Sequence, residues 1–198
     1  MTATRILGVS GSLQASSTNS ALLRIACERV GGDAELVVFD ALRDIPPFSP
    51  EIVPTPAAVD AWCALVSSSD ALLFATPEYA HGLPGVLKNA LDWLVGSGEL
   101  YGKRVAIMSA APSAERGAHA RADLERTLRA QGADVLASAT IAVPTSARGS
   151  EEADAGIVAG VHDALRVLID AVGAGPNDPT PTNATRRLTL DESTRQRI

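Results

Sequence analysis

Cysteine, surplus basic charge and long apolar runs are all scarce in this chain of 198 residues. The two cysteines, Cys27 and Cys63, both fall in amphipathic helical patterns. We therefore expect buried, reduced thiols rather than a disulfide framework. The net charge of -6 argues against non-specific binding to nucleic acid and against binding to an anionic membrane surface, because both need a basic face.

The apolar runs are also too short to span a bilayer. One of the longest, 71–75, falls far below the roughly 20 residues that a spanning helix needs. Residues 1–5 lead directly into a strand-like segment and lack the charged and apolar regions of a signal peptide. With 46% hydrophobic residues, the chain is long enough for one well-buried core. We expect a cytoplasmic protein with a single folded domain.

Short β-branched runs alternate with longer amphipathic patterns, which predicts alternating strands and helices. The segment 45–56 holds five prolines and must be irregular. The predicted strands are 5–10, 34–39, 71–75, 104–109 and about 134–143, and the predicted helices are 18–30, 56–67, 84–95, 118–131 and 151–172.

This alternation predicts a doubly wound α/β sandwich with a parallel sheet, because right-handed crossovers place helices on both faces of the sheet. Ligands of such sheets bind outside the carboxyl ends of the strands, so the loops after the first, third and fourth strands are the candidate site. We expect the domain to span 1–173. The segment 174–198, rich in proline and threonine and locally basic at its end, is expected to be an extension.

The loop 10–19 after the first strand is rich in serine, threonine and asparagine. It is not a phosphate-binding Walker loop, because no Gly-Lys-Ser/Thr follows, and Gly8 and Gly11 lack the spacing of the dinucleotide fingerprint. Its hydroxyls and amides lie before a helix N-terminus, where an anion is favoured. The loop predicts either a phosphate monoester held by neutral donors or an ordinary loop in which Ser17 or Thr18 caps the helix.

The segment 76–93, Thr-Pro-Glu-Tyr-Ala-His-Gly-Leu-Pro-Gly-Val-Leu-Lys-Asn-Ala-Leu-Asp-Trp, carries a family resemblance. It resembles the NAD(P)H-dependent FMN reductases, whose pattern is Pro-Glu-Tyr-Asn followed by Pro-Gly-x-Leu-Lys-Asn-x-Asp-Trp. The first loop resembles that family's Gly-Ser-x-Arg-x-x-Ser-x-Asn motif through Gly11, Ser12, Ser17 and Asn19. The resemblance covers about 5–172 and implies a flavodoxin-like three-layer sandwich with the strand order 2-1-3-4-5.

The resemblance implies an FMN-dependent oxidoreductase. Hydride would pass from NADPH or NADH through the flavin to a quinone, an azo compound, a metal oxyanion or a free flavin. The flavin carries this chemistry, so no catalytic side chain is required and no metal site is expected. The implied contacts with FMN come from Ser10, Ser12, Gln14, Ser17, Thr18, Asn19, Pro77, Glu78, Tyr79, Ala80, His81 and Ser109. The resemblance also implies a homodimer or homotetramer built through the 84–95 helix.

Several residue roles stay open at this stage. Tyr79 packs against the flavin or anchors its loop in the core, and Glu78 touches the flavin or accepts backbone hydrogen bonds. His81 either donates to an acceptor or is an exposed loop histidine without a role. Trp93 lies at a subunit interface or in the core.

Three positions depart from the family pattern: Gln14 replaces an arginine, Ala80 replaces an asparagine, and 109–117 replaces a glycine-rich loop. They leave two alternatives open, a one-electron carrier and a scaffold that has lost its flavin. A Rossmann-type dehydrogenase is disfavoured. Asp40 stands where a ribose-binding acid would sit, but the glycine fingerprint is missing.

Overall fold

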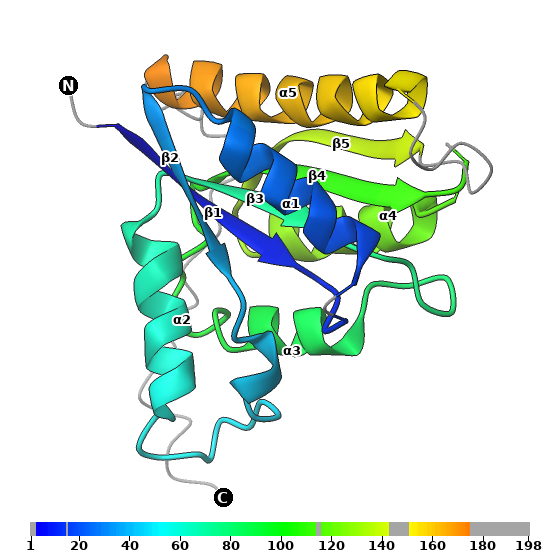
Figure 1. The fold of residues 1–198 in the computed structure, drawn as a ribbon. Coiled ribbons are helices and arrows are strands. Elements are labelled where there is room, and N and C mark those ends of the chain that lie inside the picture. The colour runs from blue at the N-terminus through cyan, green and yellow to red at the C-terminus, as the bar shows by residue number, and fades with distance from the viewer. Residues whose placement is uncertain (1–2, 15, 114–115, 143–150, 175–198) are drawn as a thin grey trace, which may run out of the picture.

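Five parallel strands form one sheet in the order β2-β1-β3-β4-β5, shown in the computed structural model of Figure 1. The structure describes residues 3–14, 16–113, 116–142 and 151–174. The strands are β1 (Thr4–Ser10), β2 (Ala34–Phe39), β3 (Ala71–Ala75), β4 (Arg104–Ala111) and β5 (Asp134–Ala142). This topology confirms the predicted doubly wound sheet.

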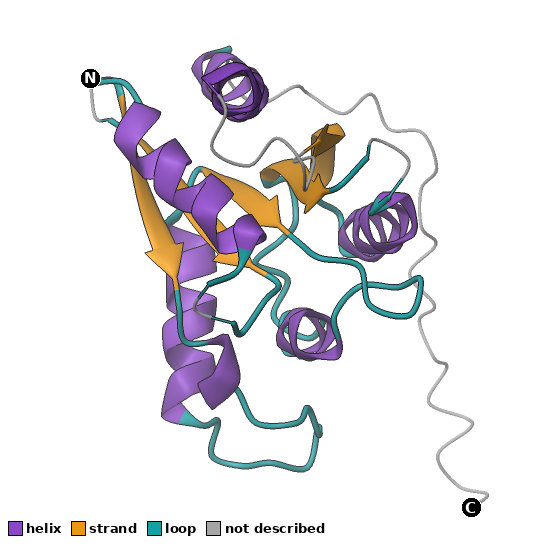
Figure 2. Ribbon diagram, turned by 45° about the vertical axis from the view of Figure 1, so that its right-hand side comes forward, coloured by secondary structure: helices purple, strands orange, loops and turns teal. Residues whose placement is uncertain are grey.

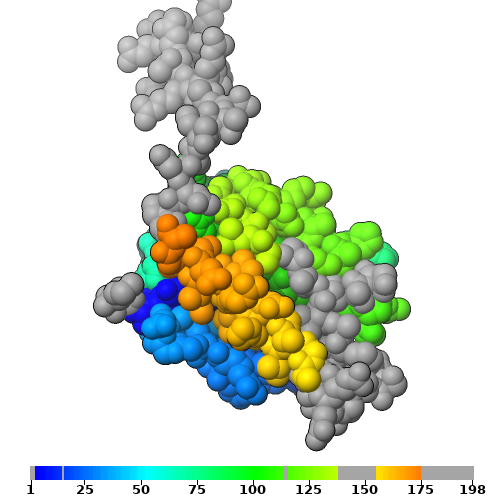
Figure 3. Space-filling model, turned by 90° about the horizontal axis from the view of Figure 1, so that it is seen from above, coloured from blue at the N-terminus to red at the C-terminus, as the bar shows by residue number. Residues whose placement is uncertain are grey.

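Helices cover both faces of the sheet, so the fold has three layers (Figure 2). The helices are α1 (Thr18–Arg29), α2 (Ala57–Ser68), α3 (Gly85–Asp92), α4 (Ala118–Ala130) and α5 (Glu151–Gly173). Helices α1 and α5 lie side by side on one face, which Figure 3 views from above, and α2, α3 and α4 pack on the other. Within the described residues, no helix combines the length and apolar character needed to cross a membrane.

The core consists of two apolar clusters, one on each face of the sheet. Strand β3 contributes to both: Leu72 and Phe74 pack toward α2, α3 and α4, while Leu73 packs toward α1 and α5. All three side chains are fully buried, and burying each contributes about 1.5–3 kcal/mol. Burial on both faces explains why this strand shows no alternation of polar and apolar residues.

Among the local differences from the prediction, two concern the segments around α3 and after β2. A short 3₁₀ helix, η1 (Leu42–Asp44), follows β2 and was not predicted. Helix α3 ends at Asp92 rather than 95, because the next amides bond three residues back, from Leu94 to Leu91 and from Val95 to Asp92. The predicted end of the last strand at 143 and the extension from 175 onward lie outside the described residues.

The thiols also differ from expectation. Cys27 and Cys63 are both free, but Cys27 is exposed and Cys63 is only half-buried, so the expectation of buried thiols is wrong for Cys27. Cys27 on α1 lies over the edge strand of the sheet, where its thiol is 3.8 Å from the carbonyl oxygen of Leu36 in β2. Its position on an amphipathic helix did not reveal which face it occupies.

The irregular segment 45–56 is held against α3 by polar side chains. The Asn89 amide oxygen accepts from the Phe48 backbone N–H at 2.8 Å, and the amide nitrogen donates to the Pro46 carbonyl at 2.9 Å. Trp93 donates its indole N–H to the same carbonyl at 2.9 Å and meets the Phe48 ring edge-to-face at 5.1 Å. Trp93 therefore packs within its own subunit, between the core and this segment.

Candidate functional site

The loops after β1, β3 and β4 lie next to one another at the carboxyl edge of the sheet. The Gly11 N–H donates to the Ala75 carbonyl at 2.8 Å, which joins the first loop to the end of β3. The Thr76 N–H donates to the Met108 carbonyl at 3.0 Å, which joins the second loop to β4. The three loops therefore form one continuous surface at the strand ends.

Gly11 is required by this close approach. A Cβ atom at Gly11 would stand 2.7 Å from the Thr76 hydroxyl oxygen, a distance that real Cβ contacts do not tolerate without a shift. Asn19 makes a further link, because its amide oxygen accepts from the Ala110 N–H at 2.8 Å. Its oxygen is thereby committed to holding the start of α1 against the end of β4.

The N-terminus of α1 is open to an anion. Ser17 occupies the N-cap position, but its side chain makes no capping hydrogen bond, and the first turn of the helix carries no acidic residue. The amides of that first turn have no acceptor within the helix, and they carry the positive end of the helix dipole. Of the two alternatives for this loop, capping by the Ser17 side chain is absent from the structure, and this helix end is suited to binding an anion.

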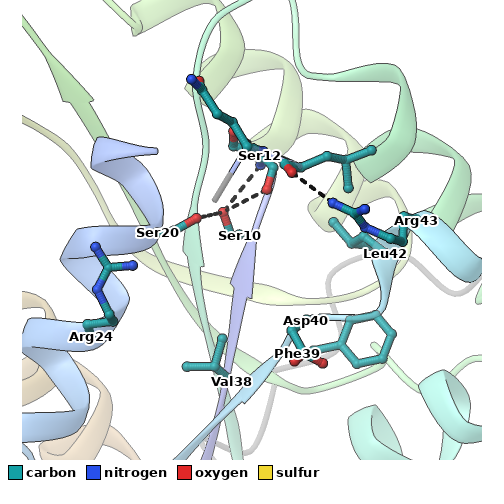
Figure 4. Close-up of a pocket in the computed structure, with 11 residues that line it drawn as sticks. Ser10, Ser12, Ser20, Arg24, Val38, Phe39, Asp40, Leu42 and Arg43 are labelled. Atoms are coloured by element: carbon teal, nitrogen blue, oxygen red, sulfur yellow. Dashed lines mark hydrogen bonds between the residues drawn. The ribbon is translucent and has the colours of Figure 1, made fainter. Parts of the chain in front are cut away.

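The hydroxyl cluster of the first loop lies beside the first turn of α1. Ser10 Oγ lies 2.8 Å from Ser20 Oγ on α1, and it accepts from the Ser12 N–H at 3.2 Å. Ser12 Oγ in turn accepts from the Gln14 N–H at 3.3 Å. Ser10, Ser12 and Gln14 line a pocket of about 440 Å³ toward β2, drawn in Figure 4.

Glu78, in the loop after β3, caps another helix. Its Oε2 accepts from the His119 N–H at 2.9 Å and the Ala120 N–H at 3.2 Å, both in the first turn of α4. Burial by itself would raise the pKa of the Glu78 carboxyl. The hydrogen bonds from Ala120 and His119, with the nearby imidazoles of His119 and His81, outweigh that effect and lower the pKa. Glu78 is therefore a carboxylate that positions its loop.

The tip of the same loop is strained and exposed. Ala80 and His81 adopt left-handed φ values of 48° and 60°, a conformation that costs about 1–2 kcal/mol per non-glycine residue. The backbones of Tyr79 and Gly82 close the tip with two mutual hydrogen bonds of 3.0 and 3.1 Å. Tyr79 is 55% exposed, so of the two alternatives left open for it, anchoring the loop in the core does not hold.

The two histidines lie beside this tip. The His81 ring contacts the His119 ring edge-to-face at 5.0 Å, and its Nδ1 is 3.5 Å from Glu78 Oε1. The His81 side chain is 81% exposed. An exposed tyrosine and an exposed histidine on a strained tip leave apolar and hydrogen-bonding surface available to a flat ligand.

Ser109 supplies a buried polar atom without a partner. The residue is 1% exposed at the end of β4, and its hydroxyl makes no hydrogen bond within the described part of the chain. Leaving such a group unpaired costs about 1–3 kcal/mol. Ser109 lines a pocket of about 210 Å³ together with Pro77, Glu78 and Gly117, so a ligand in this pocket has a hydroxyl to bond.

The residues implied by the sequence thus fall in four neighbouring places. Ser17, Thr18 and Asn19 lie at the start of α1; Pro77, Glu78 and Ser109 line the smaller pocket; Tyr79, Ala80 and His81 form the exposed tip; Ser10, Ser12 and Gln14 line the larger pocket. Sequence reasoning missed Arg24 and Arg43, which also line the larger pocket. Arg24 lies on α1 and Arg43 on η1, and only the packing of these two elements brings both arginines to the pocket. No motif of the serine loop could therefore predict them.

Comparisons with known proteins agree on one family. The family model described as NADPH-dependent FMN reductase matches residues 4–148. An NAD(P)H-dependent FMN reductase of Pseudomonas aeruginosa is 38% identical over 128 residues, which are 63% of this chain and 69% of that protein. A quinone reductase of Escherichia coli K12 is 29% identical over 129 residues, with the same two shares. A probable NADPH:quinone oxidoreductase of Oryza sativa is 38% identical over 96 residues, 46% of this chain and 47% of that protein.

Solved structures share the fold. The flavoenzyme NAD(P)H:(acceptor) oxidoreductase of Paracoccus denitrificans matches with a TM-score of 0.68 and 23% identity, over 84% of this chain and 98% of that chain. The apo form of an NADH:FMN oxidoreductase matches with a TM-score of 0.59 and 20% identity, over 83% and 90% of the two chains. These likenesses confirm the flavodoxin-like architecture.

Proposed function

The chain belongs to the NADPH-dependent FMN reductase family and is an oxidoreductase, and on that premise we propose that it holds FMN at the carboxyl edge of its sheet. Hydride passes from NADPH or NADH to a small acceptor, for which we propose the classes quinone, azo compound, metal oxyanion and free flavin. Among these acceptor classes we favour quinones, because relatives from Escherichia coli and Oryza sativa are named as quinone reductases or oxidoreductases.

The observation that carries the proposal is the pairing of two unsatisfied features at this edge. The start of α1 is open to an anion, and Ser109 holds a buried hydroxyl without a partner. The phosphate of FMN suits the start of α1, and the polar edge of its ring suits the hydroxyl of Ser109. The donor set therefore fits this cofactor.

Each group of residues has a definite task in this arrangement. Ser12, Ser17 and Thr18 offer neutral donors to the phosphate, and the α1 dipole adds a favourable partial charge. Asn19 can offer its amide nitrogen as a donor, while its amide oxygen already accepts from the Ala110 N–H. Gln14 contributes no charge at the position where the family pattern has arginine.

The second loop and Ser109 border the ring. Pro77, Glu78 and Ser109 line the smaller pocket, Glu78 fixes the loop on α4, and Tyr79 with the Ala80–His81 backbone covers the ring from the tip. Bound FMN supplies the hydride-transfer chemistry. The chain positions the cofactor and limits the access of water to it.

The test is a visible absorption scan of the purified full chain after adding FMN and removing free cofactor, followed by anaerobic NADPH and NADH. A retained flavin band that bleaches with a nicotinamide is the expected result. A band that stays oxidised would replace the proposal with an electron carrier. No retained flavin would replace it with a scaffold that has lost its cofactor.

Ser12→Asp tests the phosphate site itself. The added carboxylate repels the phosphate by about 1 kcal/mol for unit charges at 4 Å in water and about 4 kcal/mol at an effective dielectric constant near 20, so FMN affinity should fall by about fivefold to about a thousandfold. Riboflavin lacks the phosphate, and its affinity should change little. Ser68→Asp, exposed at the opposite edge of the sheet, is the matched control. Equal losses for FMN and riboflavin would mean that the phosphate lies elsewhere.

We also propose a cytoplasmic homodimer or homotetramer built through the surface around α3. Exposed apolar side chains gather near the end of this helix: Val95 is 62% exposed, and Phe48, which contacts Trp93, is 43% exposed. Covering such side chains in a second copy removes apolar surface from water. Sedimentation of the wild type should give a dimer or tetramer, and Val95→Lys should weaken it; a monomeric wild type would refute this assembly.

A further inference from the structure

A cavity between α1 and α5 lies apart from the pockets described above. It has a volume of about 530 Å³ and belongs to the helix layer that Figure 3 views from above. It shares no lining residue with the pockets of Ser12 and Ser109. On α1 it is lined by Arg29, in the last turn, about 16 Å along the helix from Thr18 at the usual rise per residue. The start of α1, where the flavin phosphate is proposed to bind, is therefore at the other end of the helix.

One flank of α5 forms the other wall of this cavity. The lining residues on this helix are Ala155, Val158, Ala159, His162 and Asp163. Their helical spacing places them on one side of α5, next to the face that buries Val161 and Leu165 against the sheet. An alanine side chain ends at its Cβ atom, so the two alanines leave the hollow between the helices open.

The polar groups of the cavity include a cation without a carboxylate partner. Within the residues that the structure describes, neither Arg29 nor His162 belongs to an ion pair, whereas Asp163 Oδ1 lies 3.9 Å from Arg166. A guanidinium group presents paired N–H donors that match the two oxygens of a carboxylate. Arg29 is therefore available to a carboxylate on a ligand, and the imidazole of His162 can donate a further N–H.

The charges around Arg29 favour a ligand with a single negative charge. Asp163 lines the same cavity and repels any second anionic group on the ligand. The last turn of α1 also carries the negative end of the helix dipole. A phosphate dianion or a dicarboxylate is therefore disfavoured. Val158 and the two alanines offer apolar surface to the body of the ligand, and the cavity falls in the range of about 300–1,000 Å³ that is usual for small-molecule sites.

We propose that this cavity binds a small monocarboxylate with an apolar body. Arg29 pairs with the carboxylate, His162 donates a hydrogen bond to it, and the apolar body lies on Val158 between the two helices. The cavity is at the opposite end of α1 from the proposed FMN site, so the ligand is an effector rather than the hydride acceptor. Its lining residues belong to neither pocket of that site, so the binding does not depend on the proposed reductase function.

The direct test is a titration of the FMN-loaded full chain with phenylpropionate, followed through the NMR shifts of the backbone amides. Saturable shifts should gather at Arg29 and within 155–163. Phenylpropionamide lacks the charge, acetate lacks the apolar body, and phenylsuccinate carries a second charge, so each should bind at least about fivefold more weakly. Equal binding of the acid and its amide would overturn the proposal. So would the absence of saturable shifts, or shifts confined to the loops of the proposed FMN site.

Two variants test the lining itself. Arg29→Gln should lower the affinity for phenylpropionate about fivefold, which corresponds to one exposed ion pair. Ala159→Glu, at an exposed position, should lower it at least about tenfold, because the new side chain fills the hollow and adds a carboxylate. Arg126→Gln and Ala122→Glu, both exposed on α4, are the matched controls and should leave it unchanged.

The outcomes keep this site separate from FMN binding. An Arg29→Gln variant that binds phenylpropionate as tightly as the wild type would overturn the proposal. The affinity should be the same in the full chain without flavin as in the FMN-loaded chain. Failure of the wild type to retain FMN would therefore count against the proposed function alone, while phenylpropionate binding that requires FMN would overturn the independent site.

Discussion

Removing the Glu78 carboxylate should loosen the loop after β3 and destabilise the fold. Glu78 Oε2 accepts two hydrogen bonds from the first turn of α4, and its side chain is only 19% exposed. Loss of a capping group costs about 0.5–2 kcal/mol, and the negative charge at a helix N-terminus adds about 0.3–1 kcal/mol. We expect Glu78→Ala to cost roughly 2 kcal/mol by these measures. Glu78→Gln should cost about half as much, because an amide oxygen still accepts.

The effect should depend on pH with a definite sign. The folded state lowers the pKa of Glu78, so the carboxylate contributes its full stability above the pKa of an unfolded glutamate, near 4.3. That contribution is lost as the pH falls through the lower, folded pKa. The difference in unfolding free energy between wild type and Glu78→Gln should therefore be constant near pH 7 and shrink below about pH 4.

Urea unfolding of wild type and both Glu78 variants, at pH 7 and again near pH 3.5, measures these differences. Glu51→Gln, an exposed glutamate in the irregular segment, controls for the loss of one negative charge. An unchanged midpoint for Glu78→Ala at pH 7 would refute the capping role. A Gln variant whose deficit persists undiminished at low pH would refute the electrostatic part.

Three further predictions follow from contacts on the same fold. Gly11→Ala should destabilise by about 1–3 kcal/mol through overpacking against the Thr76 hydroxyl at 2.7 Å, and Thr76→Ala should recover part of this in a double-mutant cycle of urea midpoints. Asn89→Ala removes the bonds to Phe48 and Pro46, so it should cost about 2 kcal/mol and speed proteolysis within 45–56; cleavage at the wild-type rate would contradict it. Burial raises the pKa of the Cys63 thiol to about 11, so its thiolate fraction at pH 8 is about a hundredfold below that of an ordinary thiol. A disulfide reagent should therefore modify exposed Cys27 first, and equal rates would refute this order.

The family motifs were the strongest part of the sequence reading. The segment 76–93 implied the family before any geometry was known, and the family model confirms that identification. The motif did not reveal why its residues are needed. Asn89 holds the segment 45–56, and Glu78 caps α4, a helix that begins forty residues later. Such partners are distant in sequence, so no local pattern encodes them.

Local sequence patterns determined where the helices and strands occur, and tertiary packing determined which side of each element is buried. Short runs of β-branched and apolar residues located β2 and β3 to the residue. For β3 the reason is that burial on both faces of a parallel sheet demands continuous apolar side chains, whereas β2 is an edge strand that buries only part of its length. The same reasoning placed Cys27 in the interior, where it is not, since a helix turned by one residue exposes a different side.

The sequence by itself determined the layers, because periodicity and crossover handedness are properties of the chain. Its two motifs implied the family, and the resemblance to that family implied the strand order. Only the tertiary structure decided what meets at the strand ends. It left the start of α1 uncapped and the hydroxyl of Ser109 unpaired, and it brought Arg24 and Arg43 to one pocket from α1 and η1. These are contacts across the sheet edge, and their energies depend on distances that no local pattern contains.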